Sequence, residues 1–253
     1  MLDYEELKNI AQLKRLSLVN TEKDYLQDLI LFGIYSNIGR ELIFKGGTCL
    51  YKVYKLNRFS EDLDFTLTKR LDMEGITKKV ISDLMLLNIR GRIKEIKEYR
   101  GGMNIRLLLN GPLYRGGKET QCFIPLNISK KEQVLLEPRR ESIMPLYREI
   151  PTFEVFAMPE EEILAEKVRA ILTRQKPRDI YDLWFLLTRK NIVFDPSLID
   201  RKLALYDLRL DLTELRNRIE RMKGLWEIDL KNLMTGELRE FDRVKEELFE
   251  KLK

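Results

Sequence analysis

A short apolar segment runs directly into a pair of glycines near the start of the chain, and this junction constrains the fold more than any other feature of the sequence. Leu42–Phe44 is typical of a short buried strand, and it is followed by Lys45, Gly46, Gly47 and Thr48. We expect a helix from about Thr48 to Lys55. Glycines let a backbone approach a phosphate closely, and amides at a helix start donate to negative charge. A tight turn between a strand and a helix explains two glycines equally well, so the junction alone predicts local structure and not a ligand.

A pair of acids begins fourteen residues after Thr48. The alternation from Leu63 to Leu67 predicts a strand, in which residues two apart point to the same face. Asp62 and Asp64 therefore present their carboxylates together. Two carboxylates on one face repel each other unless a cation neutralises them, and Mg²⁺ prefers one or two carboxylates plus substrate phosphates. An isolated pair of this kind is commonly a solvated strand face, but after a strand–glycine–helix junction it favours a metal site.

The sequence contains no histidine. This excludes Ser-His-Asp triads, Cys-His pairs, histidine zinc sites and histidine general bases. Any chemistry must therefore use carboxylates, Lys, Arg, hydroxyls, backbone amides and a bound metal.

The chain has 253 residues, enough for one large domain or two modest ones. Its first part mixes strand-like and helix-like segments, whereas Pro159 and the three glutamates after it begin a region with almost no strand signal. We expect an α+β fold with a first domain over residues 1–156 and a helical domain over residues 157–253. Thr21 is expected to cap a helix, and Pro125 is expected at a sheet edge or bulge.

The expected cellular location depends on the apolar runs, the first residues and the cysteines of the sequence. The longest apolar runs, such as Leu84–Leu87, are too short to cross a bilayer, so we expect no membrane association. The first ten residues contain acids where a secretory signal would be basic. Cys49 and Cys122 are expected to be reduced and buried. We therefore expect a cytoplasmic protein.

Positive charge is concentrated in one region. Residues 78–118 contain ten Lys or Arg and three acids, a net charge of +7, whereas the whole chain carries +5. A concentrated basic region is typical of a protein that binds a polyanion. A solvated hairpin surface explains the same excess, so both interpretations stay open.

The glycine junction and the acid pair together resemble a known signature. The stretch KGGTCLYKVYKLNRFSEDLDF is similar to that of the DNA polymerase β-like nucleotidyltransferases, and more narrowly to the AbiEii abortive-infection toxin family. In that family GGT-x-L leads to R-x-S-x-D-x-D-F, matched here by Arg58, Ser60, Asp62, Asp64 and Phe65. A second motif, A-E-K-x-x-A-x-x-x-R, is matched by Ala165, Glu166, Lys167, Ala170 and Arg174. A third, R-D-x-Y-D, is matched by residues 178–182.

The resemblance implies a polymerase β-like core, a small mixed sheet with helices, and a helical domain that completes the active-site cleft. It implies a nucleotidyltransferase that uses an NTP and Mg²⁺, with the metal held by Asp62 and Asp64. It implies catalytic roles for the same two acids, for Lys167 and for Asp182. Nucleotide contacts are implied for Lys45, Gly46, Gly47, Thr48, Arg58, Ser60, Arg174 and Arg178.

The second and third motifs also have simpler explanations. Lys167 lies on or beside the apolar stripe of its helix, where a lysine often only extends its ammonium to solvent. Asp182 is four residues after Arg178, so an ion pair within a helix explains both. Asp179 suits the first turn of the same helix. The resemblance favours a triphosphate-binding Lys167 and a functional Asp182.

One position departs from the wider superfamily, which usually places a third acid on a later strand. The segment Phe123–Ser129 is typical of that strand, and the expected position holds Asn127. An amide is a weaker metal ligand and cannot act as a base. Either the third acid is dispensable, or Asp182 replaces it in part, or activity is reduced.

The leading interpretation is an Mg²⁺-dependent transfer of a nucleoside monophosphate from an NTP to an acceptor hydroxyl. The resemblance implies the toxin of a toxin–antitoxin pair, with the 3′ end of tRNA as the acceptor and a cognate antitoxin as a partner. One alternative is nucleotidyl or phosphoryl transfer to a protein hydroxyl. Another is a catalytically silent module that binds nucleotide or RNA.

Overall fold

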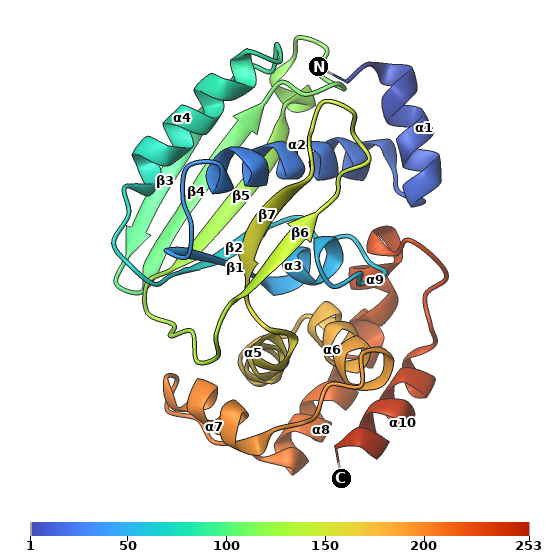
Figure 1. Cartoon of the computed structure of the whole chain (residues 1–253). Helices are drawn as coiled ribbons and strands as arrows, with labels where there is room; N and C mark the ends of the chain where they lie inside the picture. The colour runs from blue at the N-terminus through green and yellow to red at the C-terminus, as the bar shows by residue number, and fades with distance from the viewer. Residues whose placement is uncertain (1, 253) are drawn as a thin grey trace. The chain divides into compact units, whose positions relative to one another are not determined.

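The chain folds into two compact units in the computed structural model, which describes residues 2–252 (Figure 1). Unit 1 comprises Met1–Val53, Phe59–Val134 and Pro138–Ala157. Unit 2 comprises Tyr54–Arg58, Leu135–Glu137 and Met158–Lys253. Two short segments from before residue 157, Tyr54–Arg58 and Leu135–Glu137, thus belong to the same unit as the C-terminal helices.

Unit 1 is built on a mixed β-sheet. Within residues 2–252 the sheet has seven strands in the order β3-β4-β5-β2-β1-β7-β6. β1 pairs antiparallel with β2 and parallel with β7, and β2 pairs parallel with β5. The strand bounds are β1 (Leu42–Lys45), β2 (Leu63–Leu67), β3 (Gly91–Tyr99), β4 (Gly102–Leu109), β5 (Cys122–Ser129), β6 (Arg139–Ile143) and β7 (Phe153–Ala157). The strands expected at 42–44, 63–67 and 123–129 are confirmed.

Helices cover one face of this sheet. α2 contacts β5, β7 and α4, and α4 contacts β3, so both helices lie on the same side (Figure 1). Alternate residues of β4 turn toward them and are almost fully buried: Met103, Ile105, Leu107 and Leu109. The helices of unit 1 are α1 (Tyr4–Lys14), α2 (Leu18–Tyr35), α3 (Gly46–Lys52) and α4 (Met73–Met85). The core of unit 1 lies between the sheet and α2 and α4.

The opposite face of the sheet carries polar side chains, and we call it the open face. The strand register aligns one row of residues across neighbouring strands of this face. The row consists of Lys97 on β3, Asn104 on β4, Asn127 on β5, Asp64 on β2 and, beyond it, Lys45 on β1. The expected acid and the expected phosphate-binding lysine therefore lie on neighbouring strands of one surface.

Unit 2 is predominantly helical. α5 (Glu160–Thr173) begins directly after Pro159, as expected, and α6 (Pro177–Trp184) begins at a proline. A π-helical turn, η2 (Phe185–Arg189), continues α6. The remaining elements are α7 (Pro196–Ala204), α8 (Leu212–Arg221), η3 (Lys223–Leu225), α9 (Trp226–Leu230), η4 (Lys231–Leu233) and α10 (Phe241–Lys251).

Two local expectations are wrong. The N-cap of α2 is Ser17, whose hydroxyl accepts from the Asn20 N–H, so the helix begins three residues before Thr21. Pro125 lies in an interior strand, between β4 and β2, and not at an edge. The register of β5 with β2 begins at Leu126, one residue later, so the missing Pro125 N–H interrupts no pair on that side.

Cys49 and Cys122 are both free and buried, as expected. Over the described residues 2–252, no helix combines the length and the apolar character that a membrane span requires.

Candidate functional site

The glycine junction and the acid pair meet where β1 ends and β2 begins. Lys45 and Asp64 are partners in the antiparallel register of these strands, which puts Gly46 beside the Asp64 side chain. Gly46 has a φ of +75°, a conformation that side chains rarely adopt. A Cβ at this position would lie 2.5 Å from Asp64 Oδ2. The first glycine is therefore required because the Asp64 carboxylate occupies the space beside its backbone.

Thr48 makes a second connection between the two motifs. Its hydroxyl donates a hydrogen bond to the backbone carbonyl of Asp62, and its side chain is fully buried. Asp62 directly precedes β2 and is half-buried, like Asp64. Residues at the start of α3 thus contact both acids of the pair: Gly46 lies beside the Asp64 carboxylate, and Thr48 bonds the Asp62 carbonyl.

Asn127 occupies the neighbouring position on β5. It is the register partner of Asp64, and its Nδ2 donates to Asp64 Oδ1 at 3.0 Å. Its Oδ1 accepts from Arg106 Nη1 at 2.9 Å. Both polar atoms of the amide are thus engaged, and Asn127 fixes the orientation of the Asp64 carboxylate while linking it to a guanidinium on β4.

Lys45 lies next to Asp64 on β1 and is almost fully buried. Its ammonium forms an ion pair with Glu132, in the loop after β5. The Glu132 N–H in turn donates to Ser129 Oγ at 3.1 Å. The lysine expected to contact the triphosphate is therefore already neutralised by a carboxylate of its own unit.

The donors of unit 1 suit a divalent metal that shares its coordination with a substrate. Within residues 2–252 no group of three or more Asp, Glu or Cys side chains lies close enough to hold a metal ion. Mg²⁺ is commonly bound through one or two carboxylates plus substrate phosphates, so two acids suffice. The space that a Cβ of Gly46 would fill lies directly beside Asp64 Oδ2. Asp62 and Asp64 are therefore the residues that would hold the metal.

A second group of expected residues forms a buried ion cluster within unit 2. Arg58 and Asp182 are paired through two bonds, Nε to Oδ1 at 2.7 Å and Nη2 to Oδ2 at 2.6 Å. Arg174 and Asp179 are paired in the same two-bond manner, at 2.7 and 2.9 Å. Such bidentate pairs combine charge with fixed geometry. The segment Tyr54–Arg58 and the end of α5 are thus each tied to α6 by an arginine–carboxylate pair.

Lys167 bridges these two pairs from α5. Its Nζ lies 2.6 Å from Asp182 Oδ2 and 3.0 Å from Asp179 Oδ1. Its side chain is 8% exposed, so the ammonium does not extend into solvent. The five residues of the cluster comprise three cations and two acids: Arg58, Lys167, Arg174, Asp179 and Asp182.

Asp179 was not among the site residues expected from the sequence. Although burial raises its pKa, the nearby Lys167 ammonium and Arg174 guanidinium outweigh burial and hold the pKa below its ordinary value. Its place directly after Arg178 in the third motif was the only signal, and it suits a first-turn acid equally well. What the sequence does not reveal is that the chain folds Lys167 back onto this position.

The remaining expected residues have separate surroundings. The Arg178 side chain pairs with Asp229 at 2.9 Å. Ser60 is 9% exposed, and its carbonyl accepts from Gln27 Nε2. Arg58 is 1% exposed, and its guanidinium pairs with the Asp182 carboxylate. The expected residues are therefore distributed between a group in unit 1 and a group in unit 2.

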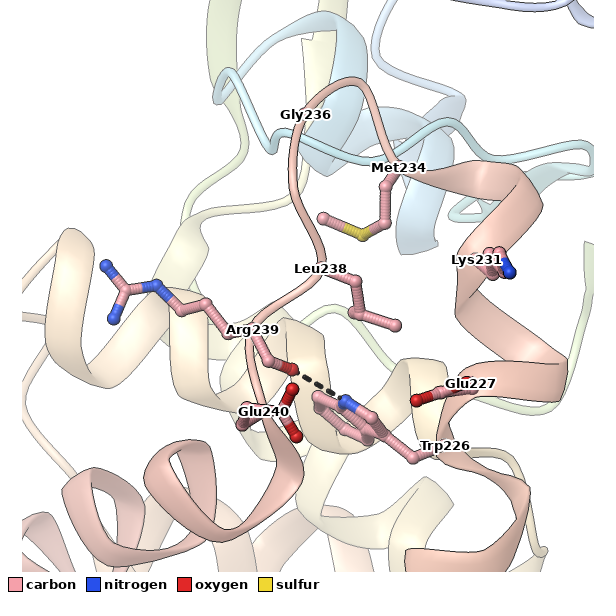
Figure 2. Close-up of a pocket in the computed structure, with 8 residues that line it drawn as sticks. All are labelled: Trp226, Glu227, Lys231, Met234, Gly236, Leu238, Arg239 and Glu240. Atoms are coloured by element: carbon pink, nitrogen blue, oxygen red, sulfur yellow. Dashed lines mark hydrogen bonds between the residues drawn. The ribbon is translucent and has the colours of Figure 1, made fainter.

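A pocket in unit 2 is lined by other residues, one of which, Met234, forms an isolated β-bridge with Arg58. The pocket has a volume of about 280 Å³ and is lined by Trp226, Glu227, Lys231, Met234, Gly236, Leu238, Arg239 and Glu240 (Figure 2). One wall is the Trp226 ring, whose Nε1 donates to the Arg239 carbonyl at 2.9 Å (Figure 2). None of the expected site residues lines it. The pocket is therefore not the candidate catalytic site.

Solved structures of other proteins share this fold. JHP933 from Helicobacter pylori is similar with a TM-score of 0.61 and 21% identity, over 92% of this chain and 90% of that one. MenT4, a nucleotidyltransferase toxin from Mycobacterium tuberculosis, is similar with a TM-score of 0.56 and 18% identity, over 92% of this chain and 75% of that one. At these identities the likeness shows the fold alone.

A protein-family model carries the comparison from fold to family. No curated protein matches the sequence. The family described as "Nucleotidyl transferase AbiEii toxin, Type IV TA system" matches residues 29–247, which include all three motifs and the residues of both groups. The chain therefore belongs to the AbiEii family and is a nucleotidyltransferase toxin of a type IV toxin–antitoxin system.

Proposed function

We propose that this toxin transfers a nucleoside monophosphate from an NTP to a hydroxyl of an RNA acceptor, of the tRNA class, in an Mg²⁺-dependent reaction. The observation that carries the proposal is the contact between the Gly46 backbone and the Asp64 carboxylate, together with the Thr48 bond to Asp62. These contacts hold two acids beside a turn without side chains, where phosphate oxygens can approach closely.

Each group of residues has a role in this proposal. Asp62 and Asp64 would hold Mg²⁺, which would polarise the α-phosphate and offset negative charge during transfer. Gly46 and Gly47 keep the approach to these acids clear. The Lys45 ammonium now pairs with Glu132. It contacts the triphosphate when this more highly charged ligand replaces Glu132 as its partner.

Unit 2 contributes positive charge. The Lys167 ammonium lies between two carboxylates, and Asp182, held by Arg58, orients it. The Arg174 side chain is 47% exposed, so its guanidinium can bind a phosphate and Asp179 together. Arg178 in α6 of unit 2, and separately Ser60 and Thr48 of unit 1, complete the set of residues for which we propose nucleotide contacts. Preorganised cations of this kind stabilise the charge of a phosphoryl transition state.

An RNA acceptor is supported by the charge of residues 78–118, which is +7. We also propose that a cognate antitoxin binds the protein and that the toxin acts in the cytoplasm, where tRNA and NTPs are available.

The test is a transfer assay with purified protein. Each NTP, labelled at the α-phosphate, is incubated with the protein, total tRNA and either Mg²⁺ or EDTA. We expect label in RNA only when Mg²⁺ is present, and no label with Asp62→Asn or Asp64→Asn. Label in protein instead of RNA supports transfer to a protein hydroxyl. Absence of label with every NTP, with the parental protein folded and binding NTP, identifies a silent binding module.

A further inference from the structure

The basic region of residues 78–118 is divided between two faces of unit 1. Lys78 and Lys79 lie on α4, where each forms an ion pair one turn away, with Glu74 and Asp83. The basic residues of β3 have different surroundings. Arg92, Lys94 and Lys97 are all exposed, and over the described residues 2–252 neither Arg92 nor Lys97 forms an ion pair. Arg92 and Lys97 on β3 are therefore among the charges that remain available to a polyanion.

Strand alternation places this charge on the open face. Lys97 is the register partner of Asn104, and Arg92 is the register partner of Leu108. Asn104 and Leu108 alternate with the residues of β4 that are buried beneath α2 and α4. Arg106 lies on the same face, opposite Glu95. Four cations and one acid thus occupy the outer three strands of the open face: Arg92, Lys94, Lys97, Arg106 and Glu95.

Two exposed aromatic rings lie among these charges. Phe123 on β5 is 38% exposed, is the register partner of Leu108, and has the Lys94 ammonium 5.7 Å from its ring centroid. Tyr99 at the end of β3 is 50% exposed. A Cβ on its partner Gly102 would lie 2.9 Å from the Tyr99 hydroxyl oxygen, so the ring lies across that glycine. Exposed rings between basic side chains are typical of surfaces on which unpaired bases stack.

The row of register partners connects this surface to the acid pair. Lys97, Asn104, Asn127 and Asp64 are successive partners on β3, β4, β5 and β2. Neighbouring strands are about 4.8 Å apart, so Lys97 and Asp64 are separated by about 14 Å of sheet. Arg106, which bonds Asn127, lies beside this row. A strand of nucleic acid lying on the outer strands therefore has a short, polar path to Asp64.

We propose that the open face of β3, β4 and β5 binds the single-stranded 3′ end of the RNA acceptor and directs its terminal hydroxyl to Asp62 and Asp64. This inference rests on the proposed function, because it names the surface that the acceptor uses. A duplex does not fit the same features, since its bases are stacked on one another and cannot reach Phe123 or Tyr99. Side chains that bond phosphates hold the backbone, and the rings select unpaired bases.

The test compares two pairs of exposed lysines, one on the open face and one on α4, where each lysine already has an acidic partner. Lys94→Gln with Lys97→Gln removes two charges from the open face, and Lys78→Gln with Lys79→Gln removes two charges from α4. Binding of a single-stranded oligoribonucleotide is measured by fluorescence anisotropy across a salt series. We expect the open-face variant to flatten the slope of log K against log salt by about 1.4, because each phosphate that the protein no longer neutralises reduces the slope by about 0.7. The α4 variant should keep the parental slope.

The aromatic contact is tested by Phe123→Leu, which keeps an apolar side chain at this position and removes the ring. We expect about tenfold weaker binding of single strands, in line with the loss of one stacked base. Binding of a blunt RNA duplex, which is weaker from the start, should not change. The parental protein should prefer a duplex with a 3′ overhang to the same duplex without one.

The outcomes separate this inference from the proposed function. If the parental protein labels RNA and the open-face variants label it equally well, the inference is overturned and the function stands. If the open-face variants lose binding while the parental protein transfers no nucleotide, the surface stands and the function does not. Equal loss in both lysine pairs, or a preference for blunt duplex, also overturns the inference. Binding of a protein acceptor in place of RNA overturns both.

Discussion

The Asp64 carboxylate lies where the side chain of any residue other than glycine at position 46 would have to be. Gly46 has a φ of +75°, and its Cβ would lie 2.5 Å from Asp64 Oδ2. Gly46→Ala should therefore displace the acid and abolish nucleotidyl transfer. The left-handed conformation alone should lower the free energy of unfolding by about 1–2 kcal/mol. Urea unfolding and the transfer assay measure the two effects.

The chain offers a matched control for this substitution. Gly116 also has a positive φ, +91°, but nothing lies within 4 Å of its Cβ position. Gly116→Ala should cause a similar loss of stability without loss of transfer. If both variants keep full activity, the contact between Gly46 and Asp64 has no part in catalysis.

Lys167 and Arg58 should respond differently to removal. Lys167→Ala leaves both bidentate pairs, Arg58 with Asp182 and Arg174 with Asp179, in place. Its main effect should be on the use of NTP, by about 1.5–3 kcal/mol in kcat/KM, as for a hydrogen bond to a charged group. Arg58→Ala removes one bidentate partner from a buried carboxylate and should lower stability by about 3–5 kcal/mol. Steady-state kinetics and urea unfolding of both variants provide the comparison.

One result would contradict the role proposed for Lys167. A Lys167→Ala protein that unfolds as easily as Arg58→Ala and retains normal kinetics marks Lys167 as a packing residue. Arg58→Lys, which restores one charge but not the two-bond geometry, should recover part of the stability.

Glu132→Gln should increase the shift in Tm that NTP causes. The buried Lys45 ammonium then loses this carboxylate, so the NTP-free protein should be less stable by about 3–5 kcal/mol. A bound triphosphate supplies the missing negative charge, so saturating NTP should raise the Tm of Glu132→Gln more than that of the parental protein. Glu98→Gln, which removes an exposed partner of Lys130, is the control and should leave the NTP-induced shift unchanged. Equal shifts in all three proteins place Lys45 outside the triphosphate site.

Asn127→Asp should make the stability of the protein depend more strongly on Mg²⁺. The new carboxylate cannot donate to Asp64 Oδ1 and faces it directly across the strands, which should cost on the order of 1 kcal/mol without metal. Mg²⁺ relieves this repulsion, so it should stabilise the variant more than the parental protein in a thermal titration. Asn104→Asp, one strand farther from Asp64, is the control. Identical Mg²⁺ responses of the two variants would falsify the assignment of the metal to this end of the sheet.

The stability of unit 2 should fall in acid. Because Lys167 and Arg174 hold the pKa of Asp179 below its ordinary value of 3.8, its ionised form contributes stability above that pH. That contribution is lost as the pH falls below 3.8. Trp184 and Trp226 are the two tryptophans of the sequence and both belong to unit 2, so their fluorescence follows this unit.

Asp179→Asn provides the comparison in the same experiment. The variant should be less stable at neutral pH, and its stability should decline less steeply between about pH 4 and pH 3 than that of the parental protein, by the linkage of about one proton. Parallel pH profiles of the two proteins would show that Asp179 does not carry the acid sensitivity.

Local sequence patterns predicted the elements that carry the unit 1 site. The strand before the glycines was predicted from a short apolar run, and the strand around Asp64 from strict alternation. Both strands are present. The N-cap of α2 was misplaced because Ser17 and Thr21 are both good caps and only the first lies at the true helix start. The interior position of Pro125 depends on where pairing with β2 begins, which is a property of the sheet and not of the segment.

The ion cluster of unit 2 was beyond prediction for a different reason. Motif spacing identified Lys167, Arg174 and Asp182, but charge type alone does not say which partners a buried residue will have. Arg58 and Asp182 are 124 residues apart in the sequence, and their pairing depends on tertiary structure. The same is true of Lys45 and Glu132, which are 87 residues apart.

The segment Tyr54–Arg58 has its partners much later in the chain than its neighbours do. The Tyr54 hydroxyl donates to the Met158 carbonyl, Asn57 accepts from Tyr181, and Arg58 pairs with Asp182. A ribosome has therefore completed every strand of the sheet before it delivers the first of these partners. A protein truncated after residue 157 would contain the residues of every strand and the acid pair, yet would leave Arg58 without Asp182. During synthesis, the pair between Arg58 and Asp182 consequently cannot form until the first helices of unit 2 have left the ribosome.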